Sequence, residues 1–485
     1  MTHNAERNST ASRRDSLVLG VTVRTLGAWP GGWRSPGAHR DPTQDPAALR
    51  AIATAAEAAG LDFLFFGDWL ATAPEFEHTD PSLLARIEPF AAISYLAAVT
   101  DRIGLITTTS SAHSEPYAVA RAIASADLLS DGRVGLSVAT GSEPRTDRNF
   151  GHGASVHNDD RYASAAEFTQ ILRGLWDSWS DDAFVSNSDS GQLINHNRLR
   201  PLNFVGRFRA SAGPLNTVRP PQGHPPIAAV VTSTASHDFA AREADIAFVS
   251  PRTLTDGAAS ATALRQLVAR AGRSAGDLVL IAPILPIVGD TPEHAWQAYD
   301  RLADLVLLAD AANGNAASGA EPVSGIPAGR DTRALAGILG IPLAGVELDD
   351  AVPVRTAARF GALGQELLAE VTRRSGRAVG AARPTTFRHL LVAHVVAAPV
   401  VVGTPTHIAD HLETWFTAGA VDGFTVLPAY TGEQLDLFLN LVVPELRQRG
   451  LVRVDDAASP PQLRHRLGLD VAPAAGDHPI DTFEI

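Results

Sequence analysis

The segment from Asp101 to Gly151 most constrains the fold of this chain, because it reads as two buried strands joined by a helix. Short apolar runs cover Ile103–Thr108 and Val134–Thr140, and a helix-like segment begins between them near Ser114. A helical crossover makes such strands parallel. Hydroxyl side chains follow both runs, and in parallel α/β folds the working residues lie just beyond the carboxyl ends of strands. The segment therefore predicts an α/β fold with a polar, phosphate-bearing ligand at that end of the sheet.

The same alternation of strand and helix continues along the chain and predicts eight strand–helix units. The 485 residues allow two or three domains, or one barrel with large insertions. The expected strands are Leu17–Val23, Leu61–Phe66, Ile103–Thr108, Val134–Thr140, Pro226–Val231, Ile246–Val249, Leu278–Ile284 and Gly423–Leu427.

Two long excursions interrupt the alternation, at about 141–223 after the fourth strand and at about 310–399 between the seventh and eighth strands. The second opens with a low-complexity loop, which suits either a lid over a barrel mouth or a plain connector. We expect residues 1–16 to be a disordered tail, 17–469 a single domain, and 470–485 a C-terminal tail.

Composition excludes several kinds of chemistry. The chain has no cysteine, and all 40 basic side chains are arginine. Disulfides, thiolate nucleophiles, Schiff-base lysines and Walker-type phosphate loops are therefore excluded. The formal net charge is -13 without a basic stripe, so we expect no nucleic-acid partner. No apolar run is long enough to span a membrane, and we expect a cytoplasmic protein.

The segment Leu17–Val23 has two interpretations. It follows Arg13 and Arg14, a pattern that faintly resembles a twin-arginine export signal. However, Arg24 cuts the apolar run short, and no convincing cleavage site follows. We therefore interpret the segment as the first barrel strand.

An ordered set of short motifs resembles the flavin-dependent monooxygenases of the bacterial-luciferase-like superfamily. Within that superfamily, the chain is similar to the group that includes nitrilotriacetate monooxygenase component A, dibenzothiophene-sulfone monooxygenase and long-chain alkane monooxygenase. The matching stretches run from about residue 17 to 469. They include Gly60–Asp68, Ala97–Leu105, Glu115–Arg121, Ser130–Arg133, Arg148–Gly151, Arg161–Tyr162, Leu175–Trp179, Pro221–Gly223, Asp422–Phe424 and Val443–Leu446.

The resemblance implies an α/β fold of the (β/α)8 TIM-barrel type with two large insertions. It implies reduced FMN, delivered by a separate NAD(P)H:flavin reductase, and dioxygen activated as a C4a-hydroperoxyflavin. One oxygen atom would enter a small organic substrate, and the apolar strand ends favour a hydrophobic one. The resemblance also implies a homodimer or homotetramer.

Carried over residue by residue, the resemblance implies a set of flavin contacts. Asp68 and Ser233 each have a structural alternative, since Asp68 could cap the following segment and Ser233 could cap a helix over Ala235–Arg242. Ser137 could be no more than a strand residue, and no catalytic acid or base is assigned. The cofactor-binding candidates are Asp68, Thr108, Ser110, Ser137, His157, Tyr162 and Ser233.

The sequence departs from the family pattern at two strands. The fourth strand usually reads Trp-Asn-Val-Val-Thr-Ser, and here Leu136–Gly141 reads Leu-Ser-Val-Ala-Thr-Gly. The usual Gln-Ala-Gly of the fifth strand is Ala229–Val231. These changes make the pocket more apolar. They leave open a deazaflavin-dependent oxidoreductase on the same fold, or a flavin-binding barrel without turnover.

Two further patterns carry weak signals. His407 and His411 have the spacing of a metal pair, but no third ligand is placed nearby, and we expect no metal. Gly135–Ala139 faintly resembles a nucleophile elbow but lies inside a strand, which argues against a hydrolase.

Overall fold

The computed structural model describes residues 14–74, 76–141, 144–151, 160–306, 333–343, 345–453 and 460–472. Within these residues, eight parallel strands close into a barrel, because β10 pairs with both β9 and β11 and β1 pairs with both β2 and β13. The predicted (β/α)8 TIM barrel is therefore confirmed. The barrel strands, in ring order, are β1 (Val18–Thr22), β2 (Phe63–Phe65), β3 (Gly104–Ser110), β4 (Val134–Ala139), β9 (Ile227–Val231), β10 (Ile246–Val249), β11 (Val279–Val288) and β13 (Gly423–Val426).

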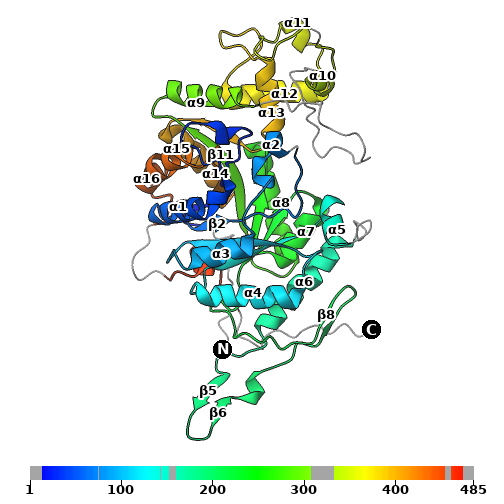
Figure 1. Cartoon of the computed structure of the whole chain (residues 1–485), viewed down its shortest axis with the longest axis vertical. Coiled ribbons are helices and arrows are strands. Elements are labelled where there is room, and N and C mark those ends of the chain that lie inside the picture. Colours follow the sequence, from blue (N-terminus) through cyan, green and yellow to red (C-terminus); the bar gives the residue numbers. More distant parts are fainter. Residues whose placement is uncertain are drawn as a thin grey trace, which may run out of the picture.

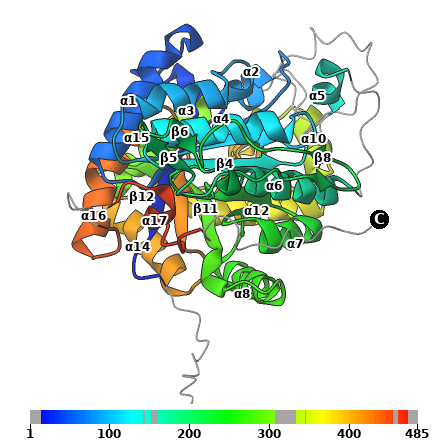
Figure 2. The same ribbon diagram turned by 90° about the horizontal axis from the view of Figure 1, so that it is seen from below.

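Helices surround this sheet, and Figure 2 shows them as a ring about the strands. Apolar side chains on the outer face of the strands pack against the helices and form the largest buried cluster. The main helices are α1 (Asp45–Ala58), α3 (Pro89–Ala97), α4 (Pro116–Leu129), α6 (Arg161–Trp176), α7 (Thr234–Glu243), α8 (Leu254–Arg270), α14 (Pro405–Thr417), α15 (Glu433–Leu437) and α16 (Val443–Gln448).

The first strand settles the choice made for Leu17–Val23. β1 is fully buried and pairs in register with β2 and β13, as a barrel strand does and an export signal would not. Arg14 is the first described residue, and its guanidinium donates to the carbonyls of Leu467 and Gly276. Residues 14–16 of the segment 1–16, which we expected to be a tail, therefore lie in the described part of the chain, and Arg14 contacts the barrel. No helix among the described residues is both long enough and apolar enough to cross a membrane.

The seventh barrel strand is longer than predicted and carries an additional partner. β11 continues past Ile284 to Val288, and its last four residues pair with β12 (Val400–Gly403) outside the barrel ring. Similarly, β3 continues past Thr108 to Ser110. These extensions lengthen the wall at the carboxyl end of the barrel.

The first excursion is divided by α6, which packs between α4 and α7 as a barrel helix. The predicted insertion at 141–223 therefore comprises two separate parts. Before α6 lies the short helix α5 (Pro144–Asn149). After α6 come two hairpins, β5 (Phe184–Asn187) with β6 (Gln192–Ile194) and β7 (Phe204–Val205) with β8 (Ala210–Ser211). In Figure 1 the β5–β6 hairpin projects away from the barrel.

The second excursion forms its own small helical layer. It contains α10 (Arg333–Leu339), α11 (Val354–Ala357), α12 (Ala362–Ser375) and α13 (Phe387–Val395), and it packs on α9 (Pro292–Asp304), which precedes it. Its apolar core includes Trp29 from the β1 loop and Leu285 and Ile287 from the extended part of β11. Figure 1 shows α10–α13 gathered at the end of the molecule opposite the β5–β6 hairpin. The low-complexity loop that opens the excursion lies outside the described residues.

The amino-terminal end of the barrel is closed from inside by the short helix α17 (Leu463–Arg466). Leu463 and Leu467 join the interior core beside Phe63 and Ile106. A Cβ placed on Gly104 would lie 2.4 Å from Cδ1 of Leu463, so a larger residue at this strand start would displace the Leu463 side chain of the plug.

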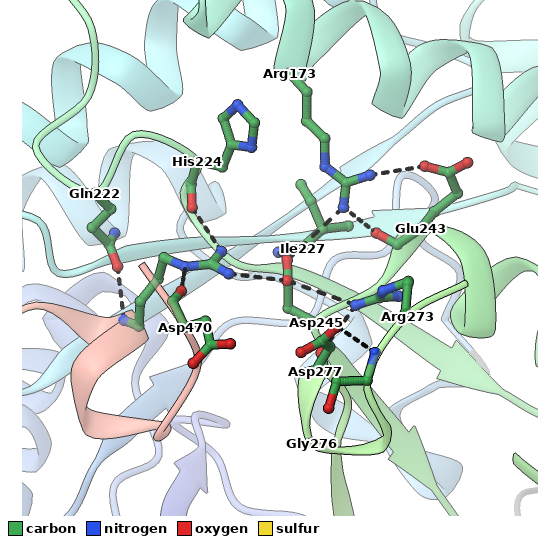
Figure 3. A network of polar contacts seen from close by, with 12 residues as sticks. Arg173, Gln222, His224, Ile227, Glu243, Asp245, Arg273, Gly276, Asp277 and Asp470 are labelled. Carbon is green, nitrogen blue, oxygen red and sulfur yellow. Dashed lines mark hydrogen bonds and ion pairs between the residues drawn. The ribbon is translucent and has the colours of Figure 1, made fainter. Parts of the chain in front are cut away.

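A buried polar network fixes this plug to the barrel (Figure 3). Asp245 accepts from the backbone N–H of Ile227 at 2.8 Å and from Arg464 of the plug at 3.4 Å. The guanidinium nitrogens of Arg273 and Arg173 lie 3.9 and 4.0 Å from the same carboxylate. Such compensation makes a buried charge tolerable.

Candidate functional site

A cavity of about 460 Å3 opens at the carboxyl end of the barrel, where β2, β3, β4 and β9 end. A cavity therefore lies where the sequence predicted a ligand site, and its volume is within the range of small-molecule sites. The lining residues are Asp68, Trp69, Leu70, Thr108, Ser110, Val138, Ala139, Thr140, Gly141, Thr146, Arg161, Tyr162, Ala229, Val230, Thr232 and Phe239.

The β2–β3 wall of the cavity carries three of the predicted contacts. Asp68 follows β2, and Thr108 and Ser110 lie two residues apart on β3, so both β3 side chains face the same side of the strand. Thr109, between them, hydrogen-bonds Ser114 instead. The hydroxyl of Thr108 donates to the carbonyl of Phe66 at 2.7 Å. This wall therefore holds two hydroxyls and one carboxyl group in fixed positions.

Asp68 combines the structural and the ligand-facing interpretations. Its Oδ1 accepts from the backbone N–H of Trp69 at 2.8 Å, so the side chain does cap the following segment. It also lines the cavity. Burial raises the pKa of Asp68 above its ordinary value, against the opposing effects of the Trp69 N–H and the charge of Arg86.

The first residues of α6 form another part of the cavity lining. Arg161 and Tyr162 both line the cavity, and the Arg161 guanidinium carbon lies 5.0 Å from the centre of the Tyr162 ring. The Tyr162 ring in turn lies 6.0 Å from that of Phe239. Among the described residues, Arg161 forms no ion pair with a carboxylate, and its buried Nε has no hydrogen-bond partner. A cation left uncompensated beside a helix amino terminus is suited to an anionic ligand group.

Two of the three remaining predicted contacts, Ser233 and Ser137, are not among the residues that line the cavity. Ser233 is the N-cap of α7, where its hydroxyl accepts from the backbone N–H of Ser236. It follows Thr232, which lines the cavity, so the hydroxyl lies near the rim. Ser137 is buried inside β4, one position before the cavity wall, and is not a lining residue. His157 lies outside the described residues.

Three wall features escaped the sequence analysis. Arg161 was noted only as part of the motif Arg161–Tyr162 and was not among the predicted cofactor contacts. Trp69 lines the cavity, and its indole N–H is buried without a partner among the described residues. The third feature is a hydrogen-bonded group formed by Ser110, His113 and Asp147. Nothing in the local sequence indicates that Asp147 reaches His113.

The histidine pair on α14 shows no sign of a metal site. Burial, followed by the charge of His407, lowers the pKa of His411 to about 4. The His411 ring lies 5.7 Å from that of Trp415. Among the described residues, no group of three or more His, Cys, Asp and Glu side chains could hold a metal ion.

Comparison with known proteins identifies the family. The sequence profile of the luciferase-like monooxygenases matches residues 31–422. This chain belongs to the luciferase-like monooxygenase family. It is 32% identical to N-acetyl-S-(2-succino)cysteine monooxygenase of Bacillus subtilis (strain 168), with 95% of this chain and 98% of the relative covered. It is also 32% identical to nitrilotriacetate monooxygenase component A of Aminobacter aminovorans, with 93% and 96% covered.

Solved structures agree with this assignment. A crystal structure of a riboflavin lyase with modified FMN and riboflavin superposes with a TM-score of 0.72 and 26% identity, covering 94% of this chain and 96% of that one. Because its named relatives are monooxygenases of this family, the chain is a flavin-dependent monooxygenase.

The cavity of this luciferase-like monooxygenase fits a flavin. The lining carries one cation, Arg161, and several hydroxyls, including Thr108 and Ser110, which are the kinds of group that a phosphate and the polar edge of a flavin ring would need. The Trp69 indole N–H and the Arg161 Nε are buried donors without partners among the described residues. Buried polar groups are nearly always hydrogen-bonded, so such atoms at a cavity are suited to a ligand.

Proposed function

We propose that this luciferase-like monooxygenase is the oxygenating component of a two-component system that uses FMNH2 from a separate NAD(P)H:flavin reductase. One relative is named as a component A, which supports a partner protein for this chain too. Bound reduced FMN supplies the electrons that activate dioxygen, so that one oxygen atom enters the substrate and the other leaves as water. The observation that carries the proposal is the Arg161 guanidinium, which lines the same cavity as the Thr108 and Ser110 hydroxyls and has no carboxylate partner among the described residues.

The residues of the chain have separate tasks in this proposal. Arg161 and Tyr162, with Ser233 at the rim, bind the phosphate end. Asp68, Thr108 and Ser110 orient the ring. The apolar wall excludes water, which protects a reactive oxygen species from wasteful release. That wall consists of Leu70, Val138, Ala139, Ala229, Val230 and Phe239.

The same apolar wall supports a small hydrophobic organic substrate rather than a polycarboxylate. The described lining contains one arginine and no histidine, and we assign that arginine to the phosphate. A substrate with several carboxylates would need further cations here. In this respect the chain would differ from relatives whose names refer to nitrilotriacetate and succinocysteine.

A homodimer or homotetramer is part of the proposal. The β5–β6 hairpin projects from the barrel (Figure 1) and exposes Phe184, Val185 and Leu193 at 46%, 43% and 62%. Two-stranded hairpins are marginal alone, and apolar side chains on a projecting hairpin suit a second copy of the chain.

Anaerobic binding of reduced FMN, followed by 18O2 and a substrate panel, tests the proposal. We expect reduced FMN to bind and one 18O atom to enter a hydrophobic test substrate, such as a thioether or alkane, only when a flavin reductase and NAD(P)H are present. If reduced FMN does not bind, the proposal is wrong, and a deazaflavin would be the next cofactor to try.

A further inference from the structure

Ser110, His113 and Asp147 form a continuous hydrogen-bonded chain that starts at the cavity wall. Ser110 Oγ lies 2.9 Å from His113 Nδ1, and His113 Nε2 lies 3.0 Å from Asp147 Oδ1. The His113 side chain is only 2% exposed and the Asp147 side chain 13%. Ser110 lines the cavity, whereas Asp147 comes from α5 on the far side of the imidazole.

Packing holds the imidazole in this position. The His113 ring lies 4.7 Å from the ring of Phe150. On another side, a Cβ on Gly141 would lie 3.2 Å from His113 Cε1 and 3.1 Å from Ser110 Oγ. Gly141 has a φ of +59°, so glycine is favoured there both by the backbone and by the close approach. The His113 ring therefore has little freedom to turn away.

For a neutral His113 imidazole, these contacts determine where the protons lie. A carboxylate only accepts hydrogen bonds, so His113 Nε2 carries the hydrogen that points at Asp147. In a neutral imidazole the other nitrogen is then an acceptor, so the Ser110 hydroxyl must donate to Nδ1. Because the only hydroxyl hydrogen of Ser110 is donated to His113, Ser110 can act toward the cavity only as a hydrogen-bond acceptor.

Thr108 is also only a hydrogen-bond acceptor toward the cavity. Its hydroxyl donates to the carbonyl of Phe66, which cannot donate in return. Thr108 and Ser110 therefore present two oriented acceptors to the cavity from one face of β3. A wall built this way favours a ligand that brings N–H or O–H groups and disfavours one that brings a lone pair.

We propose that Ser110, with its proton held by His113 and Asp147, makes the cavity select reduced flavin over oxidised flavin. This inference rests on the proposed flavin function. Reduced flavin carries a hydrogen on N5, whereas oxidised flavin has a lone pair there, so a wall of fixed acceptors distinguishes the two redox states. Ser110 is the contact residue, and His113 and Asp147 are positioning residues that act through it.

The dissociation constants of oxidised FMN and of anaerobic reduced FMN test the selection. In Asp147→Asn the amide can donate as well as accept, so the imidazole tautomer and the Ser110 proton are no longer fixed. We expect the ratio of the oxidised to the reduced constant to fall about three- to tenfold, as for one hydrogen bond. Ser110→Ala should lower the ratio similarly. Thr109→Val, which removes a hydroxyl from the other face of β3, should leave it unchanged.

The proton arrangement has its own readout in the flavin-free protein. Nitrogen-15 NMR of His113 should show the tautomer with hydrogen on Nε2 in the wild type and in Ser110→Ala, and a mixture in Asp147→Asn. Two results would overturn this inference but not the proposed function. One is a wild-type His113 that carries its hydrogen on Nδ1. The other is a ratio of the two FMN dissociation constants that stays unchanged in Asp147→Asn and Ser110→Ala. Failure of both FMN forms to bind the wild type would overturn the proposed function as well.

Discussion

The two ends of the barrel treat their charged side chains in opposite ways. At the amino-terminal end, the buried Asp245 carboxylate is surrounded by Arg464, Arg173 and Arg273 (Figure 3). At the carboxyl end, Arg161 lines a cavity and has no carboxylate partner in the described part of the chain. Compensation within the chain indicates a structural role, whereas an uncompensated charge beside a cavity indicates a ligand.

Some of the family motifs lie at the structural, amino-terminal end of the barrel, and others lie at the cavity. Ser130–Arg133 and Pro221–Gly223 meet at the amino-terminal end, where Gln222 donates to Asp127 at 2.6 Å and to the carbonyl of Val134 at 2.8 Å. Its Oε1 accepts from the backbone N–H of Arg464 at 2.8 Å. Gly60–Asp68 and Arg161–Tyr162, in contrast, reach the cavity. A shared motif therefore does not by itself mark a flavin contact.

The largest effect should come from removing the central charge of the structural end. Asp245→Asn leaves three guanidinium groups around a neutral side chain, and we expect a loss of about 3–5 kcal/mol in the free energy of unfolding. Urea unfolding at neutral pH measures it. Asp181→Asn is the matched control, because Asp181 is 74% exposed and pairs with Arg219 at 3.4 Å, a contact worth less than about 1 kcal/mol.

The pH dependence of the same charge sharpens this test. Burial alone would raise the pKa of Asp245, but the charges of Arg464 and Arg173 outweigh it and lower the pKa overall. A lowered pKa in the folded state gives stability that is present at neutral pH and lost as the pH falls through that value. The gap between wild type and Asp245→Asn should therefore narrow in acid, and a gap independent of pH would contradict the assignment.

The reverse pattern is expected at Arg161, where binding should change and stability should not. Arg161→Gln should weaken reduced FMN binding about ten- to hundredfold, the range for a hydrogen bond to a charged group. Its unfolding free energy should change by less than about 0.5 kcal/mol. Isothermal titration under anaerobic conditions measures the affinity. Arg207→Gln is the control, since Arg207 is 69% exposed and pairs with Asp160; equal weakening in both would refute the phosphate role.

An effect that varies with pH is expected at Asp127, a buried carboxyl group at the structural end. Burial raises its pKa from 3.8 to about 7, although Gln222 and Val134 donate to it. Between those values the folded state binds more protons than the unfolded state, so stability falls as the pH rises through this window, by up to about 1.4 kcal/mol per pH unit. Asp127→Asn cannot titrate, so its stability relative to the wild type should increase from pH 4.5 to pH 7.5. A constant difference would contradict this assignment.

The barrel itself was predictable because its strands follow a simple rule. Buried parallel strands are continuous apolar runs, and those expected at Ile246–Val249 and Gly423–Leu427 agree with β10 and β13 to within one residue. The extension of β11 was missed because Pro283 and Pro286 interrupt its pattern, and proline usually marks the end or edge of a strand. β12 was missed with it, since its only described strand partner is that extension.

The site was predictable where residues follow strands and obscure where distant segments meet. Asp68, Thr108 and Ser110 lie at strand ends, and their place at the cavity follows from the fold. The contact between His113 and Asp147 depends on how α5 folds back on β3, which no local pattern encodes. Arg464 is likewise more than 200 residues from Asp245 along the chain. Tertiary contacts of this kind follow from packing of the whole chain, not from local sequence.

The smallest effect on either end of the barrel should come from the β5–β6 hairpin. Phe184→Asp places a charge on an exposed apolar side chain that stacks on Trp179 at 5.1 Å. We expect the barrel unfolding transition and the affinity for reduced FMN to be unchanged. The proposed homo-oligomer, measured by sedimentation velocity, should dissociate to monomers because a charge opposes burial of the hairpin at an interface. Val471→Asp, at a site that is 92% exposed, should leave the assembly intact. If Phe184→Asp sediments like the wild type, the hairpin is not the contact between copies.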